Sequence, residues 1–236
     1  MPKSGKLYKT MLAKVDPTKK YSLDEALGLI DEMPTRKFDE SVELSVQLGV
    51  DPKQSDQMVR GAAALPNGIG KAVRVVAFVR GEAEREAKEA GADHVGSDSI
   101  IEQIEKGWVE FDRLITTPES LKDLTKVAKI LGPKGLMPNK KTGTVTTEIG
   151  KAIREQKLGK VAYKVEKAGI IHAIFGKKSF GATKLRENFI VLFDNILKAK
   201  PTTSKGIYIR KATIGTTMGP GLHLDASSLE ALVKGL

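Results

Sequence analysis

The chain has 236 residues, of which 40% are hydrophobic, with no cysteine and a formal net charge of +10. The length suffices for one large or two smaller cores, and the absence of cysteine excludes disulfides and thiolate zinc sites. The first residues lack the apolar core of a signal peptide, and no stretch approaches the roughly 20 apolar residues that cross a bilayer, so we expect a cytoplasmic protein without membrane contact.

Positive charge is concentrated in the C-terminal third of the chain. Residues 1–66 hold 10 basic and 10 acidic side chains, residues 67–159 hold 16 and 14, and residues 160–236 hold 13 and 5. A basic excess of this kind favours a polyanionic partner, although a solvated basic face would have the same composition.

The first clear elements are a helix over 22–33 and a strand over 41–50. Ser22-Leu-Asp-Glu25 has the form of a capping box, and apolar residues follow it at helical spacing. The strand alternates apolar and polar residues, which predicts one dry face and one wet face. Phe38 lies beside Lys37 at the entrance of the strand, and the residues alone favour a core position for the phenylalanine.

After the glycine-rich hinge Leu65-Pro-Asn-Gly-Ile-Gly-Lys71, predicted strands alternate with predicted helices. The strands are expected over 73–79, 93–95 and 114–115, and the helices over 82–90, 100–106, 118–131 and 147–156. This alternation predicts a parallel sheet covered on both faces, which forms a second, Rossmann-like domain.

No catalytic constellation accompanies this second domain. Its first strand runs into Arg80-Gly-Glu-Ala-Glu84, where a dinucleotide site would need G-x-G-x-x-G. His94, His172 and His223 are scattered and are interpreted as structural or surface side chains. We therefore expect no cofactor, no metal and no enzymatic activity. The glycine- and lysine-rich stretch 130–145 fits an anion-binding nest or an ordered loop packed on the sheet about equally well.

The C-terminal third begins with strands over 161–165 and 170–175 around Glu166-Lys-Ala-Gly169, a sequence typical of a hairpin turn. Ser179 is expected to cap the following helix, which carries an apolar stripe and ends near Lys200. A strand from Ile207 then leads into the next motif.

That motif is Thr213-Ile-Gly-Thr-Thr-Met-Gly-Pro-Gly221. Its three glycines allow conformations that other residues avoid, and Pro220 fixes the chain between two of them. Thr217 offers a hydroxyl, Met218 a polarizable apolar arm, and Gly219 room for close approach. We interpret the segment as a recognition surface, with an ordinary surface turn as the alternative.

The alternating strands at 41–50, 161–175 and 207–214 are expected to share one antiparallel sheet. The fold class is then mixed α+β and α/β with two domains. Residues 1–66 and 160–236 form a discontinuous α+β sandwich domain with an antiparallel sheet, and residues 67–159 form an inserted Rossmann-like three-layer α/β domain.

Several motifs resemble one known family over essentially the whole chain: the ribosomal protein numbered one of the large subunit, in its bacterial type. They are Lys37-Phe-Asp-Glu-Ser-Val-Glu43, Leu48-Gly-Val-Asp-Pro52, Ser55-Asp-Gln57, Val59-Arg-Gly61, Ala90-Gly-Ala-Asp93, Ile130-Leu-Gly-Pro-Lys-Gly-Leu-Met-Pro-Asn139 and Thr216-Thr-Met-Gly219. The resemblance implies a protein that binds large-subunit (23S-type) rRNA and forms the mobile stalk. It also implies release of deacylated tRNA from the exit site, repression of the protein's own operon mRNA, and a monomer outside the ribosome.

Carried over position by position, the resemblance implies two groups of RNA-binding residues. The main contact cluster is Phe38, Thr217, Met218 and Gly219, with Lys37, Ser41 and Glu43 nearby, and Lys164 and Lys167 would meet phosphates. The resemblance thus changes the predicted role of Phe38 from a core residue to an RNA contact. Two other functions stay open, an α/β enzyme that binds nucleotide in the inserted domain and a general basic scaffold for nucleic acid. The tail 223–236 has no assignment.

Overall fold

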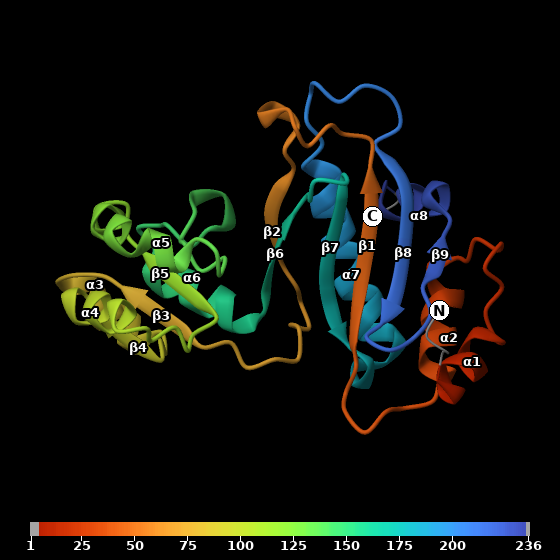
Figure 1. Ribbon diagram of the computed structural model, residues 1–236, viewed down its shortest axis with the longest axis horizontal. Helices are drawn as coiled ribbons and strands as arrows, with labels where there is room; N and C mark the ends of the chain where they lie inside the picture. The colour runs from red at the N-terminus through yellow and green to blue at the C-terminus, as the bar shows by residue number, and fades with distance from the viewer. Residues whose placement is uncertain (1–4, 235–236) are drawn as a thin grey trace. The chain divides into compact units, whose positions relative to one another are not determined.

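The computed structural model describes residues 5–234 and divides the chain into two compact units (Figure 1). One unit contains the chain up to Gly70 together with the chain from Val161 onward, and the other is Lys71–Lys160. Several sheets and helices give a mixed α/β architecture. Among the described helices, none is both long and apolar enough to cross a membrane.

A four-stranded antiparallel sheet in the order β7-β1-β8-β9 forms the centre of the first unit (Figure 1). Its strands are β1 (Ser41–Leu48), β7 (Ile170–Lys177), β8 (Ile209–Thr216) and β9 (Leu222–Leu224). The alternation predicted for β1 is confirmed, because Val42, Leu44, Val46 and Leu48 are all buried. The strand ends two residues earlier than predicted, at a register shift beside Leu48.

Four helices complete this unit: α1 (Lys6–Leu12), α2 (Leu23–Glu32), α7 (Gly181–Lys198) and α8 (Ala226–Lys234). The predicted capping box of α2 is confirmed, since Ser22 Oγ accepts from Glu25 N at 3.3 Å and Glu25 Oε2 accepts from Ser22 N at 3.2 Å. The apolar stripe of α7 is buried in the core that the sheet covers. The tail 223–236, which had no assignment, contributes the last two residues of β9 and, over its described part, helix α8.

The predicted cap of α7 is wrong. Ser179 lies in a short 3-10 turn, η4 (Lys178–Phe180), and its hydroxyl donates to Asp39 Oδ2 at 2.6 Å. The helix begins at Gly181 without a side-chain cap. Ser179 therefore bonds to the loop before β1 and does not cap α7.

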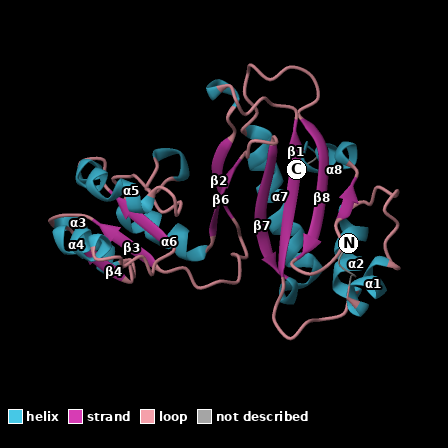
Figure 2. Cartoon of the chain, in the orientation of Figure 1, coloured by secondary structure: helices cyan, strands magenta, loops and turns pink. Residues whose placement is uncertain are grey.

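The expectation that 161–175 lies in one sheet is also wrong. The tight turn is present, with Gly169 N donating to Glu166 O at 2.9 Å, but β6 (Lys160–Lys164) leaves β7 and pairs with β2 (Arg60–Ala64) in a separate two-stranded sheet (Figure 2). Val161 and Tyr163 of β6 are buried in the core of the unit, and the Tyr163 hydroxyl donates to Asn195 O at 3.0 Å. Burial of these two side chains separates the strands.

The second unit contains a three-stranded parallel sheet in the order β4-β3-β5. Its strands are β3 (Val75–Phe78), β4 (His94–Gly96) and β5 (Arg113–Thr116), and its helices are α3 (Glu82–Glu89), α4 (Asp98–Glu105), α5 (Ala128–Leu131) and α6 (Ile149–Leu158). Val76 and Phe78 pack in one cluster with α4 and α5, whereas Val75 and Ala77 pack in another with α3 and α6. Both faces of the sheet are thus covered by helices.

Part of the predicted helix 118–131 has a different geometry. Residues Ser120–Val127 form 3-10 helix η2, and only Ala128–Leu131 form α-helix. The Thr125 hydroxyl donates to Lys122 O at 2.6 Å, a local bond that competes with the α-helical pattern. The following stretch is ordered, because Leu136 and Met137 pack against the core cluster while Lys134 and Lys140 are exposed. Two further 3-10 turns are η1 (Ser55–Gln57) and η3 (Lys140–Thr142).

Candidate nucleic-acid interface

The segment Thr216–Gly219 forms a tight turn between β8 and β9, closed by a 3.1 Å hydrogen bond from Gly219 N to Thr216 O. The expected unusual glycine conformations are wrong here, because neither Gly215, Gly219 nor Gly221 has a positive φ. Steric crowding explains why position 219 is a glycine, since a Cβ there would lie 2.5 Å from Thr216 Oγ1. We call this segment the 216–219 turn.

The 216–219 turn is attached to the start of β1 by reciprocal hydrogen bonds. Thr217 N donates to Ser41 O at 3.1 Å, and Ser41 N donates to Thr217 Oγ1 at 3.0 Å. These bonds satisfy backbone groups beyond the last ladder pair of β1 and β8. They hold two segments separated by more than 170 residues in one rigid surface.

A buried carboxylate, which the sequence did not reveal, supports the same turn. Glu40 is 2% exposed, and its Oε1 accepts from Met218 N at 2.9 Å and from Thr216 Oγ1 at 3.5 Å. The Glu40 backbone carbonyl accepts from Lys178 N at 2.9 Å. The chain from 34 to 40, here called the 34–40 loop, is thereby fixed to both η4 and the 216–219 turn.

Lysines from the end of β7 strengthen this attachment. Lys177 Nζ donates to Ser41 Oγ at 2.9 Å and to Asp39 O at 3.3 Å. Lys178 is buried, and its ammonium donates to the carbonyl of Met33 at the end of α2. Both lysines hold the loop in place, a role that sequence patterns do not distinguish from that of any other basic residue.

Two large apolar side chains project from this well-held framework. Phe38 in the 34–40 loop and Met218 in the 216–219 turn are each 51% exposed. The core position that the residues alone favoured for Phe38 is therefore wrong. Lys37 and Glu43 are exposed as well, and Glu43 lies opposite Gly215 in the β1–β8 register.

The uncovered face of the four-stranded sheet carries a polar row that sequence reasoning missed. Ser45 of β1 and Thr213 of β8 are register partners, and His172 and His223 flank them on the two edge strands. Ser45 Oγ lies 3.0 Å from His172 Nδ1, and Thr213 Oγ1 lies 3.1 Å from His223 Nδ1. Both histidines are exposed, in agreement with their interpretation as surface side chains.

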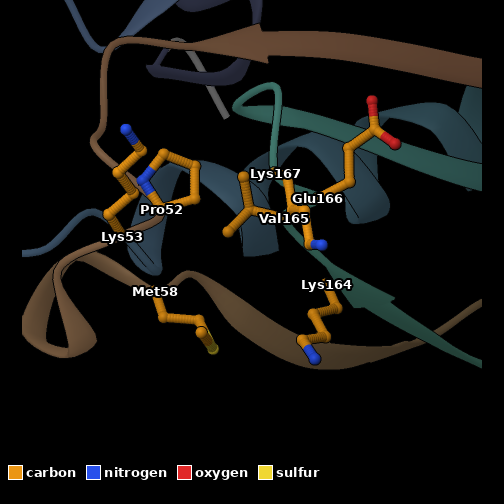
Figure 3. A pocket seen from close by; sticks show the side chains of 7 residues that line it. All are labelled: Pro52, Lys53, Met58, Lys164, Val165, Glu166 and Lys167. Atoms are coloured by element: carbon orange, nitrogen blue, oxygen red, sulfur yellow. The ribbon is translucent and has the colours of Figure 1, made fainter.

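Lys164 and Lys167 lie near the opposite end of β1, where Leu48 N donates to Gly169 O of the same turn at 2.8 Å. An eight-residue strand spans about 24 Å, so these lysines are well separated from the 216–219 turn. They line a pocket of about 710 Å³ together with Pro52, Lys53, Met58, Val165 and Glu166 (Figure 3). Lys53 is a third cation of this cluster that the sequence did not single out.

Among residues 5–234 no group of three His, Asp or Glu side chains is placed to hold a metal ion. Exposed apolar side chains beside Lys37, on a turn held by hydrogen bonds, are instead typical of a protein that binds a macromolecular partner.

Comparison with known proteins gives the family. Residues 30–220 match the family described as Ribosomal protein L1p/L10e, and the chain belongs to that family. It is 51% identical over 228 residues to the large ribosomal subunit protein uL1 of Bdellovibrio bacteriovorus, covering 97% of each chain. It is 48% identical over 235 residues to the protein of the same name from Solidesulfovibrio magneticus, covering 100% of each. The predicted family and the non-enzymatic nature of the protein are confirmed.

Proposed function

We propose that this structural constituent of the large ribosomal subunit binds large-subunit rRNA through the surface formed by the 34–40 loop, the start of β1 and the 216–219 turn. The observation that carries the proposal is the pair of half-exposed side chains, Phe38 and Met218, on a backbone fixed by the buried Glu40. The exposed half of each apolar side chain has no partner in the described structure, and unstacked bases and riboses offer it one.

The surface suits RNA recognition because its groups are already in place before binding. A-form RNA is read through shape, 2′-hydroxyls and splayed bases, since its deep groove excludes side chains. The Thr217 hydroxyl, which already bonds to Ser41, keeps one lone pair, and with the carbonyl of Gly219 it offers acceptors next to Met218. Because Ser41 and Thr217 bond each other, little conformational freedom is lost when RNA binds. Lys37 and Glu43 complete the edge of this surface.

The lysines at the other end of β1 supply the sequence-independent part of binding. Lys164 and Lys167, with Lys53 beside them, present three ammonium groups around one pocket (Figure 3). Ammonium groups near phosphates release counterions on binding and so make affinity depend on salt. Specific contacts at the 216–219 turn and phosphate contacts at these lysines form the proposed division of roles.

We further propose that the unit Lys71–Lys160, which lies close to the predicted bounds 67–159, is the inserted Rossmann-like domain, and that the terminal parts form the rRNA-binding domain. In the proposed function it is the mobile part of the stalk and assists release of deacylated tRNA from the exit site. Five of its exposed lysines lie close together in sequence from η2 to η3 and support a polyanion partner: Lys122, Lys126, Lys129, Lys134 and Lys140. The same rRNA-binding surface would bind a similar structure in the protein's own operon mRNA and repress its translation. The protein acts as a monomer outside the ribosome, without membrane contact.

Reconstitution tests this proposal directly. Large ribosomal subunits that lack their native protein of this family are mixed with the wild-type chain, sedimented, and probed by nuclease footprinting. We expect stoichiometric co-sedimentation and protection of one compact rRNA element. Gly219→Val should abolish the protection, whereas the exposed-surface variant Glu32→Ala should retain it. Binding without a discrete footprint would favour the general nucleic-acid scaffold instead.

A further inference from the structure

A shallow pocket adjoins the proposed rRNA surface on the side of the first helix. It has a volume of about 460 Å³ and is lined by Gly5, Lys6, Leu7, Tyr8, Arg36 and Met218. This volume falls within the roughly 300–1,000 Å³ of small-ligand sites. Of the predicted contact residues only Met218 belongs to it, so the pocket extends the surface in a direction that the sequence did not indicate.

The lining combines two cations with apolar walls. Lys6 and Arg36 contribute positive charge, and no acidic residue is among the described residues that line the pocket. Leu7 and Met218 are 47% and 51% exposed, and Tyr8 is half-buried against the core. A ligand that fits must therefore offer both a negative charge and a flat or apolar body.

Arg36, one of the residues that line the pocket, has an unsatisfied hydrogen-bond donor. Its Nε lies out of contact with solvent and has no hydrogen-bond partner in the described part of the chain. Such a donor has lost its water without gaining an acceptor, which disfavours the free state relative to one in which an anionic oxygen is bound. When Nε turns toward a ligand in the pocket, the guanidinium fork can donate two parallel bonds to a phosphate.

We propose that this pocket binds one unpaired nucleotide of the RNA that the 216–219 turn contacts. The base packs against Tyr8, Leu7 and Met218, and the phosphate pairs with Arg36 and Lys6. A nucleotide is the occupant that supplies a π-face and an adjacent phosphate together, and the shared Met218 makes the pocket continuous with the rRNA surface. The proposal rests on the proposed function and adds a defined subsite to it.

Binding of the rRNA fragment that wild-type protein protects from nuclease tests the subsite. Arg36→Ala should raise the Kd about tenfold, the scale of a lost charge-assisted contact, and lower the log–log salt slope by about one. Arg85→Ala is the charge-matched control, because Arg85 is an exposed arginine of α3 in the other unit, and it should change the Kd less than twofold. Arg36→Lys should recover the salt slope but not the affinity, since an ammonium lacks the fork. Lys6→Ala should also weaken binding.

A second readout locates the nucleotide itself. The same fragment, substituted with 4-thiouridine at unpaired positions, is irradiated with the full-length protein and the cross-linked peptides are sequenced. A cross-link at Tyr8 that Arg36→Ala diminishes supports the proposal. Equal affinity of Arg36→Ala and Arg85→Ala, with no such cross-link, overturns it.

The controls separate this failure from failure of the proposed function. If Gly219→Val still weakens binding while Arg36→Ala does not, rRNA binding stands and the subsite is wrong. If Gly219→Val also binds like wild type, the rRNA surface itself is wrong. A third outcome is that Arg36→Ala binds the RNA fragment normally and yet co-sediments poorly with large subunits. That result would assign the pocket to a protein neighbour and overturn the proposal that it binds a nucleotide.

Discussion

The buried carboxylate of Glu40 accepts a 2.9 Å hydrogen bond from the backbone N–H of Met218, a residue 178 positions away in the chain. The same Oε1 atom lies 3.5 Å from the Thr216 hydroxyl. This bond sets the position from which Met218 projects into solvent. A side chain with no exposure of its own thus determines the shape of the exposed surface.

Replacing Glu40 should affect both stability and RNA binding. Glu40→Ala leaves the Met218 amide without its acceptor, and a lost bond to a buried charged group corresponds to roughly 1–3 kcal/mol of unfolding free energy. We expect rRNA affinity to fall as well, because the 216–219 turn loses its fixed position.

Urea denaturation and amide hydrogen exchange at Met218 measure these two effects. Glu32→Ala, an exposed glutamate at the end of α2, serves as the matched control and should leave both unchanged. Unaltered protection of the Met218 amide in Glu40→Ala would show that the carboxylate does not hold the turn.

A second prediction concerns the contact between Gly219 and Thr216. A Cβ at position 219 would lie 2.5 Å from Thr216 Oγ1, closer than such atoms approach in folded proteins. Gly219→Ala should therefore destabilise the protein by about 1–3 kcal/mol through overpacking. Thr216→Ala removes the hydroxyl and should relieve most of that loss in the double variant.

A double-mutant cycle of unfolding free energies measures this coupling. Additive effects of the two substitutions would contradict the steric explanation for the glycine. The same steric contact predicts that Gly219→Val lowers both stability and RNA affinity. The larger side chain of valine disturbs the 216–219 turn before any RNA is present.

The comparison of sequence and structure shows which features local patterns determine. Strand β1 was predictable because alternation of apolar residues is a property of the strand itself. Strand β2 was not, since Arg60-Gly-Ala-Ala-Ala64 has small side chains with little strand preference and forms a strand only beside β6. The separation of β6 from β7 likewise depends on where Tyr163 is buried, which is a tertiary effect.

The candidate site divides in the same way. Motif resemblance identified Phe38, Met218 and Gly219, but only the structure showed the acceptor at Glu40 and the lysine bonds of Lys177 that hold them. Those bonds join segments far apart in the chain, and neither residue type nor spacing reveals them. The unsatisfied Nε of Arg36 could not be predicted from the sequence for the same reason.

Salt dependence should distinguish the two proposed contact regions. Lys164→Ala and Lys167→Ala should weaken binding of cognate and noncognate RNA alike and lower the log–log salt slope by roughly one or less. Phe38→Ala should weaken cognate binding by about 1–3 kcal/mol and leave the slope unchanged, because stacking releases no counterions.

Affinities measured by filter binding between 50 and 200 mM salt, about the range over which phosphate contacts dominate, test this division. Lys88→Ala, which changes an exposed lysine of α3 in the other unit, is the charge-matched control. If Lys164→Ala and Lys167→Ala both kept the wild-type salt slope, the proposed phosphate contacts of these lysines would be wrong.

Acid stability of the second unit should depend on Asp112. Hydrogen bonding from the Lys71 ammonium at 2.7 Å, helped by the amide of Arg74 and opposed by partial burial, lowers the pKa of Asp112 from its usual 3.8. Because the folded pKa is depressed, its contribution to stability is present above the ordinary value and is lost as pH falls through the lower folded value.

Trp108 is the one tryptophan of the chain and lies in this unit, so its fluorescence reports unfolding of the unit in the full-length protein. Asp112→Asn should lower the unfolding free energy by about 1 kcal/mol at pH 7, since the group is partly exposed, and the difference should shrink steadily as the pH falls below the ordinary value of 3.8. Glu119→Gln, with an exposed side chain in the same unit, should match wild type across the titration. A difference that stays constant through the acid titration would exclude the ionised carboxylate as its cause.

The last prediction concerns removal of Lys71–Lys160 and joining of Gly70 to Val161 through about four glycines. Residues before the junction are attached to the first unit, because Asn67 N donates to Asn188 Oδ1 at 3.0 Å and Asn188 Nδ2 donates to Gly68 O at 2.8 Å. The core of that unit contains no residue of the excised segment. We therefore expect a cooperatively folded protein that binds the rRNA fragment within about twofold of wild type and loses affinity on Gly219→Val.

In ribosomes that lack the native protein, the shortened chain should occupy the rRNA site but fail to accelerate release of deacylated tRNA, since the exposed lysines proposed to meet tRNA are gone. Circular dichroism and urea titration first establish that the shortened chain is folded. Loss of rRNA binding by a folded shortened protein would contradict the division of roles between the two units. Normal tRNA release would contradict the role proposed for the excised one.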